Sequence, residues 1–128
     1  MTNTSIPKWQ YVTGWVLSGL LGPLFASSAF AKIAQPAGFL DGWTKNYPAG
    51  SALPLGCIEI GMYILYLVPK TRYLGGLIML GYLGGAVATH VHMDDPKGAI
   101  PVLVGIAAWL GLWLRDPKAR AILPLTND

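Results

Sequence analysis

The sequence has little charge and almost no cysteine. Charged residues make up 12% of its 128 residues, against about 25% in soluble domains, whereas hydrophobic residues make up 53%. Nine basic and six acidic side chains are too few to cover the surface of a water-soluble domain of this length. The single cysteine, Cys57, excludes a disulfide-stapled secreted domain. The composition therefore indicates that most of the chain lies in lipid.

Other absences exclude further classes of protein. Disorder is disfavoured, because the hydrophobic content is high and the net charge is only +3. The basic residues are scattered rather than gathered into a stripe, which argues against nucleic-acid binding in spite of a pI of about 9.1. The sequence contains no glycine-rich phosphate loop, zinc-protease motif or serine nucleophile elbow. The length allows a single domain, residues 1–128.

Four long apolar stretches are separated by short charged segments. Three of them contain no charge, and the fourth contains only Glu59. Apolar residues run continuously instead of alternating, which favours helices over the strands of a membrane barrel. The predicted spans cover residues 12–30, 53–68, 73–90 and 100–114. We therefore predict an all-α fold, an integral membrane antiparallel four-helix bundle in the lipid bilayer.

The first stretch has a second interpretation. Lys8, the apolar run and the sequence Ala29-Phe30-Ala31 before Lys32 resemble a secretory signal peptide with its cleavage site. The charge-free stretch is longer than the roughly 7–15 apolar residues of such peptides. We therefore favour an uncleaved transmembrane helix.

The basic residues predict the orientation in the membrane. With four spans, six of the nine lysines and arginines lie on the side of the two termini and three lie on the other side. The six are Lys8, Lys70, Arg72, Arg115, Lys118 and Arg120. The positive-inside rule then places both termini in the cytoplasm, and we expect a multi-pass protein of a bacterial inner membrane.

The loop of about residues 33–52 is longer than a connection requires. It carries Phe39, Leu40, Trp43 and Tyr47, a spacing that predicts an interfacial turn or short helix. Such a segment either anchors the chain at the lipid headgroups or forms a lid over a site.

Small residues form rows on two of the spans. Gly81 and Gly85 make a G-x-x-x-G pair in the third span, and Gly14, Ser18 and Gly22 form a row in the first. Close backbone packing drives helix association in lipid, so we predict that both rows are helix contact surfaces. Either row can pack within the chain or in a homodimer.

Glu59 is the one charge inside a predicted span. It lies about 9 Å below the outer end of the second span, where a carboxylate costs roughly 2.5–3.5 kcal/mol. Topology puts two partners at similar depth, Lys32 and His90. Tyr63 and Tyr66 share the helical face of Glu59 and could add hydroxyls. These five residues are the predicted ligand-binding candidates; alternatively, a structural Lys–Glu pair fixes helix register.

Two further features of the sequence are weaker candidates for a functional site. His90 and His92, followed by Asp94 and Asp95, are poorly spaced for metal ligation from one helical face, so we expect no metal site. Cys57 stands alone near a helix start, and we expect it to pack rather than react.

Several short motifs resemble the DoxX-like bacterial membrane proteins. They are residues 56–61 (GCIEIG), residues 82–90 (YLGGAVATH), and Trp109 to Leu112 leading to residues 115–117 (RDP). Lys32, after the small residues 26–31, is similar to the end of that family's first helix. The resemblance implies a small inner-membrane protein similar to a subunit of a thiosulfate:quinone oxidoreductase, with other members linked to oxidative-stress complexes. It marks Lys32, Glu59 and His90 as matching positions.

Two classes of function follow. In the first, the bundle is a quinone- or lipid-binding subunit of a membrane redox system. Glu59 or His90 exchanges a proton there, and a partner protein supplies electrons, because no redox centre is visible in the sequence. In the second, the chain is a non-enzymatic scaffold or small-solute transporter with a structural Lys32, Glu59 and His90 cluster. Quinone extracted from the purified protein in stoichiometric amount distinguishes the two.

Overall fold

The computed structural model describes residues 5–122, and most of them are helical. The elements are α1 (Lys8–Ala34), α2 (Phe39–Trp43), η1 (Ala49–Ser51), α3 (Ala52–Leu67), α4 (Arg72–His92), η2 (Pro96–Gly98), α5 (Ala99–Arg115) and α6 (Pro117–Ile122), where η marks a 3-10 helix. Residues 5–122 contain no strand, which confirms the predicted all-α fold.

Four helical segments are long and apolar enough to cross a membrane. They are Lys8–Ala34, Ala49–Leu67, Arg72–His92 and Pro96–Arg115. Each predicted span lies within one of them, except that Val68 is already extended and follows the end of α3. Pro69 comes next and cannot continue a helix. The protein is therefore a multi-pass membrane protein whose environment is the lipid bilayer.

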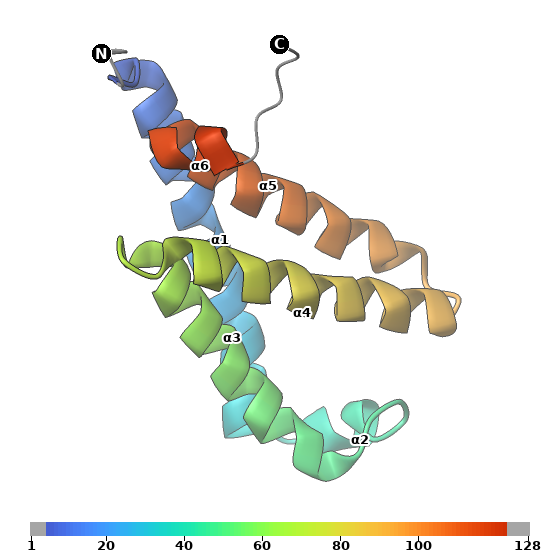
Figure 1. Cartoon of the computed structure of the whole chain (residues 1–128). Helices are drawn as coiled ribbons and strands as arrows, with labels where there is room; N and C mark the ends of the chain where they lie inside the picture. Colours follow the sequence, from blue (N-terminus) through green and yellow to red (C-terminus); the bar gives the residue numbers. More distant parts are fainter. Residues whose placement is uncertain (1–4, 123–128) are drawn as a thin grey trace.

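The four long helices form an antiparallel bundle that opens at one end. α1 packs against α3 and α5, and α4 packs against the same two helices. In Figure 1 the pair α1 and α3 and the pair α4 and α5 lie close together near α6, then diverge toward α2 and η2. We call the diverging end, with α2 and η2, the loop end. The opposite end, where α3 passes into α4 and α5 into α6, is the terminal end.

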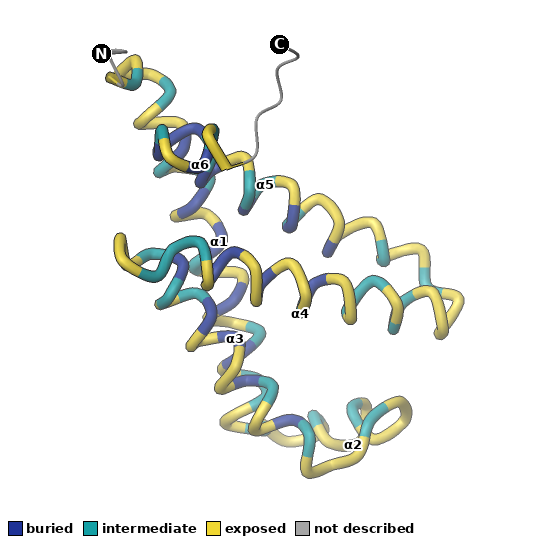
Figure 2. The backbone as a smooth tube through the Cα atoms, in the orientation of Figure 1, coloured by how far each residue is buried: buried dark blue, intermediate teal, exposed yellow. Residues whose placement is uncertain are grey.

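Buried residues gather where the helices cross. Figure 2 shows them concentrated at the terminal end and along the inner faces, whereas the outer faces are exposed. The buried core includes Phe25, Met62, Tyr66, Met79 and Leu112. Large apolar side chains cover the exposed faces, as expected of helices that contact lipid.

Glycines allow the close helix contacts at the terminal end. A Cβ at Gly14 would lie 2.7 Å from the backbone N of Arg115, and one at Gly22 would lie 3.0 Å from the hydroxyl of Tyr63. Ser18, between these glycines, is fully buried. The first predicted row of small residues is therefore confirmed as a contact surface, and it packs within the chain.

The second predicted row does not pack in this way. A Cβ at Gly81 or Gly85 would meet no atom within 4 Å, and the same holds at Gly84. The prediction that this row contacts a neighbouring helix is wrong within the described chain. These glycines lie on the part of α4 where the two helix pairs diverge, and Gly81 and Gly85 line a cavity there instead.

The closest approach of α3 and α4 predicts a strong effect of one methyl group. A Cβ at Gly75 would lie 2.2 Å from the backbone N of Tyr66, so Gly75→Ala must push the two helices apart. We expect the free energy of unfolding to fall by about 1–3 kcal/mol or more, as for other overpacked sites. Gly61→Ala is the matched control, because a Cβ there meets nothing within 4 Å. Unfolding by SDS in mixed micelles, followed by circular dichroism, measures both; equal stability of the two variants would contradict the predicted contact.

Candidate functional site

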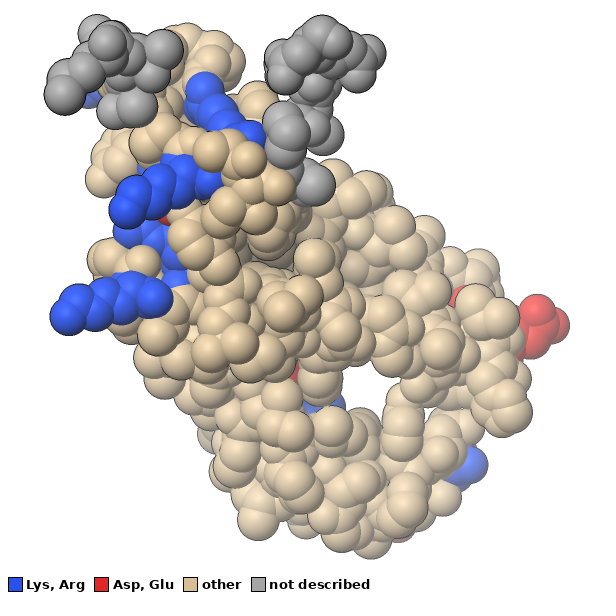
Figure 3. Space-filling model, in the orientation of Figure 1, with Lys and Arg blue, Asp and Glu red and all other residues tan. Residues whose placement is uncertain are grey.

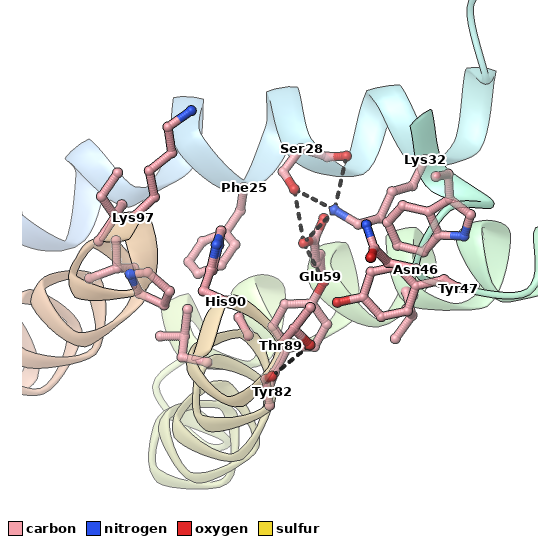
Figure 4. Close-up of a pocket in the computed structure, with 18 of the residues that line it drawn as sticks. Phe25, Ser28, Lys32, Asn46, Tyr47, Glu59, Tyr82, Thr89, His90 and Lys97 are labelled. Atoms are coloured by element: carbon pink, nitrogen blue, oxygen red, sulfur yellow. Dashed lines mark hydrogen bonds and ion pairs between the residues drawn. The ribbon is translucent and has the colours of Figure 1, made fainter. Parts of the chain in front are cut away.

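Glu59 of α3 is buried and holds three hydrogen bonds on one oxygen. The residue is 2% exposed. Its Oε1 accepts from Lys32 Nζ at 3.0 Å, from Ser28 Oγ at 3.0 Å and from Tyr82 OH at 2.5 Å (Figure 4). The ion pair is well shielded, since the side chains of Lys32 and Glu59 are 12% and 3% exposed. The predicted pairing of these two residues is therefore confirmed.

Local sequence explains how three helices meet at this carboxylate. Ser28 and Lys32 are one turn apart on α1, and Lys32 Nζ donates to Ser28 Oγ at 2.6 Å. Gly56 lies about one turn before Glu59 on α3 and lets α1 come close, since a Cβ there would lie 3.0 Å from Lys32 Cβ. Tyr82 comes from α4. We call Ser28, Lys32, Glu59 and Tyr82 the Glu59 cluster.

The second oxygen of the carboxylate has no partner. Glu59 Oε2 is buried and lacks a hydrogen bond within the part of the chain that the structure describes. Buried polar atoms are usually paired, so an unpaired carboxylate oxygen is a costly arrangement. The Glu59 cluster therefore contains one carboxylate oxygen whose acceptor capacity is unused.

A cavity of about 850 Å³ lies beside this cluster, at the loop end. Figure 3 shows the molecule hollowed where the helix pairs diverge. Most of the wall is apolar, and Phe25, Leu55, Leu83 and Val104 contribute to it. The Glu59 cluster supplies a polar patch on that wall. The cavity thus suits a largely apolar ligand with one hydrogen-bonding group.

The loop between α1 and α3 covers part of this cavity. The predicted short helix is present as α2, and the rings of Phe39, Trp43 and Tyr47 line the cavity. Successive rings stack, with centroids 5.6 Å and 4.4 Å apart. Trp43 Nε1 donates to the carbonyl of Pro48 at 3.1 Å, which fixes the stack to the start of α3. In this structure the aromatic residues form a wall of the site, as the lid interpretation expects.

His90 lines the same cavity but does not join the Glu59 cluster. Its Nδ1 lies 3.0 Å from Oδ2 of Asp95, and no hydrogen bond links it to Glu59 within residues 5–122. The expected three-way contact of Lys32, Glu59 and His90 is therefore wrong as a direct contact. The reason is local: α4 ends at His92, and the turn that follows brings Asp95 back to His90.

Asp95 also caps the short helix η2. Its Oδ1 accepts from the backbone N of Lys97 at 3.0 Å. This N–H, followed by the contact with His90, holds the pKa of Asp95 below its ordinary value. The Asp-Pro-Lys sequence repeats at residues 116–118, where Asp116 Oδ1 accepts from the backbone N of Lys118 at 3.0 Å. Both copies are turn-capping elements.

Tyr63 and Tyr66 do not line the cavity. Tyr63 OH donates to the carbonyl of Ser18 at 2.9 Å, and Tyr66 OH donates to the carbonyl of Ala108 at 2.5 Å. The prediction that they add hydroxyls around Glu59 is wrong. They lie one and two turns nearer the terminal end, where α3 is in close contact with α1 and α5, so their hydroxyls reach backbone carbonyls of those helices.

Sequence reasoning missed two residues of the Glu59 cluster, Ser28 and Tyr82. Tyr82 lies about ten residues from the loop end of its span, as Glu59 does. Equal depth on neighbouring antiparallel spans is a signal that could have identified it. Tyr82 directly follows Gly81, for which the sequence predicted only a packing role.

A second polar cluster closes the terminal end. Arg115 is 4% exposed; its Nε donates to Ser18 Oγ and its Nη2 to the carbonyl of Tyr66, both at 3.0 Å. Its guanidinium also lies 4.2 Å from the centroid of the Trp15 ring. Asp116 pairs with Arg72 at 2.9 Å. These contacts tie α1, α3, α4 and α5 together, so they explain why the bundle is closed at this end.

The remaining candidate residues of the sequence do not belong to the Glu59 cluster. Within residues 5–122, no group of three or more His, Cys, Asp or Glu side chains is placed to hold a metal ion. His92 is exposed. Cys57 is exposed as well, so the expectation that it packs is wrong; it lies on the outer face of α3.

Comparison with known families decides the relationship. The model of one family, described as DoxX-like, matches residues 16–112. The chain belongs to the DoxX-like family. The DoxX-like region runs from α1 to α5 and contains the whole Glu59 cluster and His90, whereas Arg115, Asp116 and α6 lie beyond it. No curated protein and no solved structure matches the chain.

Proposed function

We propose that this DoxX-like protein binds a quinol or quinone in the loop-end cavity, as the membrane subunit of a redox system. The observation that carries the proposal is the unpaired, buried Glu59 Oε2 beside an apolar cavity of about 850 Å³. Small-molecule sites commonly measure about 300–1,000 Å³, are mainly apolar and carry a few polar groups. A ring with hydroxyl or carbonyl groups and an apolar tail fits such a site.

The hydrogen-bond inventory of the Glu59 cluster favours a ligand that donates. Lys32 directs its protons at Ser28 and Glu59, and the hydroxyls of Ser28 and Tyr82 both donate to Glu59 Oε1. Acceptor capacity remains at Glu59 Oε2 and on the Tyr82 oxygen. A quinol hydroxyl donates, whereas a quinone carbonyl only accepts. The cluster therefore supports binding of the reduced ligand.

His90 offers a second acceptor in the same cavity. With its Nδ1–H donating to Asp95, the neutral ring presents Nε2 as an acceptor. The side chain of His90 is 30% exposed, and that of Asp95 is 24% exposed. A proton that reaches His90 can therefore pass to water at the loop end.

The residues of the chain then have separate roles. A bound quinol supplies two-electron, two-proton chemistry, and its electrons pass to the redox centre of a partner protein. Glu59 accepts one hydroxyl proton at Oε2, and His90 accepts the other at Nε2. Lys32 offsets the charge of the carboxylate in its apolar surroundings. Tyr82 holds the carboxylate through Oε1, so that Oε2 stays oriented for the ligand.

The distribution of basic side chains indicates on which side of the membrane the loop-end cavity lies. Lysine and arginine side chains gather at the terminal end in Figure 3. By the positive-inside rule, this supports the proposal that the terminal end and both termini face the cytoplasm of a bacterial cell. The cavity would lie in the outer leaflet of the inner membrane, where a ligand enters from the lipid between the diverging helix pairs.

Ligand retention tests the proposal. Organic extraction of protein purified in mild detergent is expected to yield about one quinone per chain. A short-chain ubiquinol, added anaerobically to extracted protein, is expected to bind with saturation. Absence of quinone from repeated preparations, together with no saturable binding of either redox form, would refute the proposal and leave the scaffold or small-solute transporter as the function.

A further inference from the structure

A second cavity lies in a groove between α4 and α5. Its volume is about 540 Å³, and none of the residues that line it is charged. The α4 side extends from Leu80 to Val87, and the α5 side extends from Pro101 to Trp113. Leu83 and Pro101 line this groove and the loop-end cavity, so they form part of the partition between the two. The groove is therefore separate from the Glu59 cluster.

Two tryptophans in this groove have unsatisfied donors. Trp109 and Trp113 lie one turn apart on α5, and the Nε1 of each is buried without a hydrogen-bond partner among residues 5–122. An indole N–H can only donate, and a buried donor normally finds an acceptor. Each of these N–H groups is therefore a donor that an acceptor oxygen from outside the chain would satisfy.

The groove ends beside cationic side chains. At the terminal end the Arg120 guanidinium lies 4.5 Å from the ring centroid of Trp113, and Arg120 Nε donates to the Trp113 carbonyl at 3.0 Å. Lys118 is exposed on the same short helix, α6. Asp116, the acidic residue of this region, is paired with Arg72. An anion at the mouth of the groove would meet net positive charge.

We propose that this groove binds one anionic phospholipid. An acyl chain lies between α4 and α5, the ester carbonyls accept from the Nε1 atoms of Trp109 and Trp113, and the phosphate faces Arg120 and Lys118. From Pro101 to Trp113 the helix rises about 18 Å, close to one leaflet of a hydrocarbon core of ~30 Å. The exposed cation Lys118 at the mouth of the groove favours an anionic headgroup over the apolar face of a second helix. This proposal does not depend on quinone binding.

Lipid titration of the whole chain tests this site. Protein in a neutral detergent is titrated with dioleoyl phosphatidylglycerol or dioleoyl phosphatidylcholine, and bound lipid is counted by native mass spectrometry. We expect one tight site that prefers phosphatidylglycerol. Trp109→Phe and Trp113→Phe keep a ring but remove the N–H, so each should weaken binding of both lipids roughly 2- to 10-fold. Lys118→Gln should reduce the preference for phosphatidylglycerol about 5-fold. Trp9→Phe, at an exposed tryptophan of the terminal end, should change neither.

The outcomes separate lipid from other occupants. Unchanged lipid binding in both tryptophan variants would overturn the proposal. A dimer of the wild-type chain that binds no lipid in this site and dissociates on Trp113→Phe would overturn it in favour of a second copy. Circular dichroism checks folding; if one tryptophan variant does not fold, the other tryptophan variant and Lys118→Gln still decide the matter.

Discussion

Replacing Lys32 with methionine is expected to lower the free energy of unfolding by about 3–5 kcal/mol. The change removes the cation and leaves the Glu59 carboxylate, whose side chain is 3% exposed, with only two hydroxyl donors. An unpaired charge in an apolar interior is among the most costly single changes in a protein. Unfolding by SDS in mixed micelles measures the loss.

A double variant separates the charge from the shape of the side chain. Lys32→Met with Glu59→Gln removes both charges, so most of the lost stability should return. Lys45→Met is the matched control, because Lys45 also lies at the loop end but is exposed. If Lys32→Met loses no more than the Lys45 control, the buried ion pair does not stabilise the bundle. If the double variant is no more stable than Lys32→Met alone, packing of the lysine stem accounts for the loss.

The sequence predicted the membrane fold because charged residues are rare within membrane-spanning segments and concentrate in the loops between them. The four helices follow from the charge-free stretches, and Lys32 pairs with Glu59 because a buried carboxylate requires a cation at similar depth. Depth along a helix is readable from residue counting, since each residue rises by a fixed distance. These are the parts of the site that sequence reasoning could supply.

The rest of the site depends on where the helices diverge. Tyr63 and Tyr66 share a face with Glu59, but α3 passes from the open loop end into close packing within two turns, so their hydroxyls bond elsewhere. His90 turns to Asp95 because of the geometry of the loop that follows α4. Gly81 lines the cavity rather than a helix contact for the same reason. Crossing geometry depends on many small contacts at once, and helical periodicity does not contain it.

Glu59→Gln is expected to reverse the preference of the loop-end cavity for the redox state of its ligand. Lys32, Ser28 and Tyr82 all donate to Oε1, so the amide oxygen of glutamine must take that place and its NH₂ group must replace Oε2. An acceptor in the cavity becomes a donor. Quinol should bind roughly 10- to 100-fold more weakly, as expected for a lost hydrogen bond to a charged group. Quinone should bind no worse than to the wild-type chain, because its carbonyl then meets an N–H.

Paired titrations with a short-chain ubiquinol and the matching ubiquinone measure this change in preference. His92→Gln is the control, because His92 is exposed and does not line the cavity. Tyr82→Phe removes a donor from Oε1 but leaves the carboxylate, so it should weaken both ligands by a similar and smaller factor. An equal loss of both redox forms in Glu59→Gln would mean that Glu59 shapes the cavity without contacting the ligand. A selective loss of quinol requires the Glu59 carboxylate to accept a hydrogen bond from the ligand, which distinguishes a ligand-binding carboxylate from a purely structural ion pair.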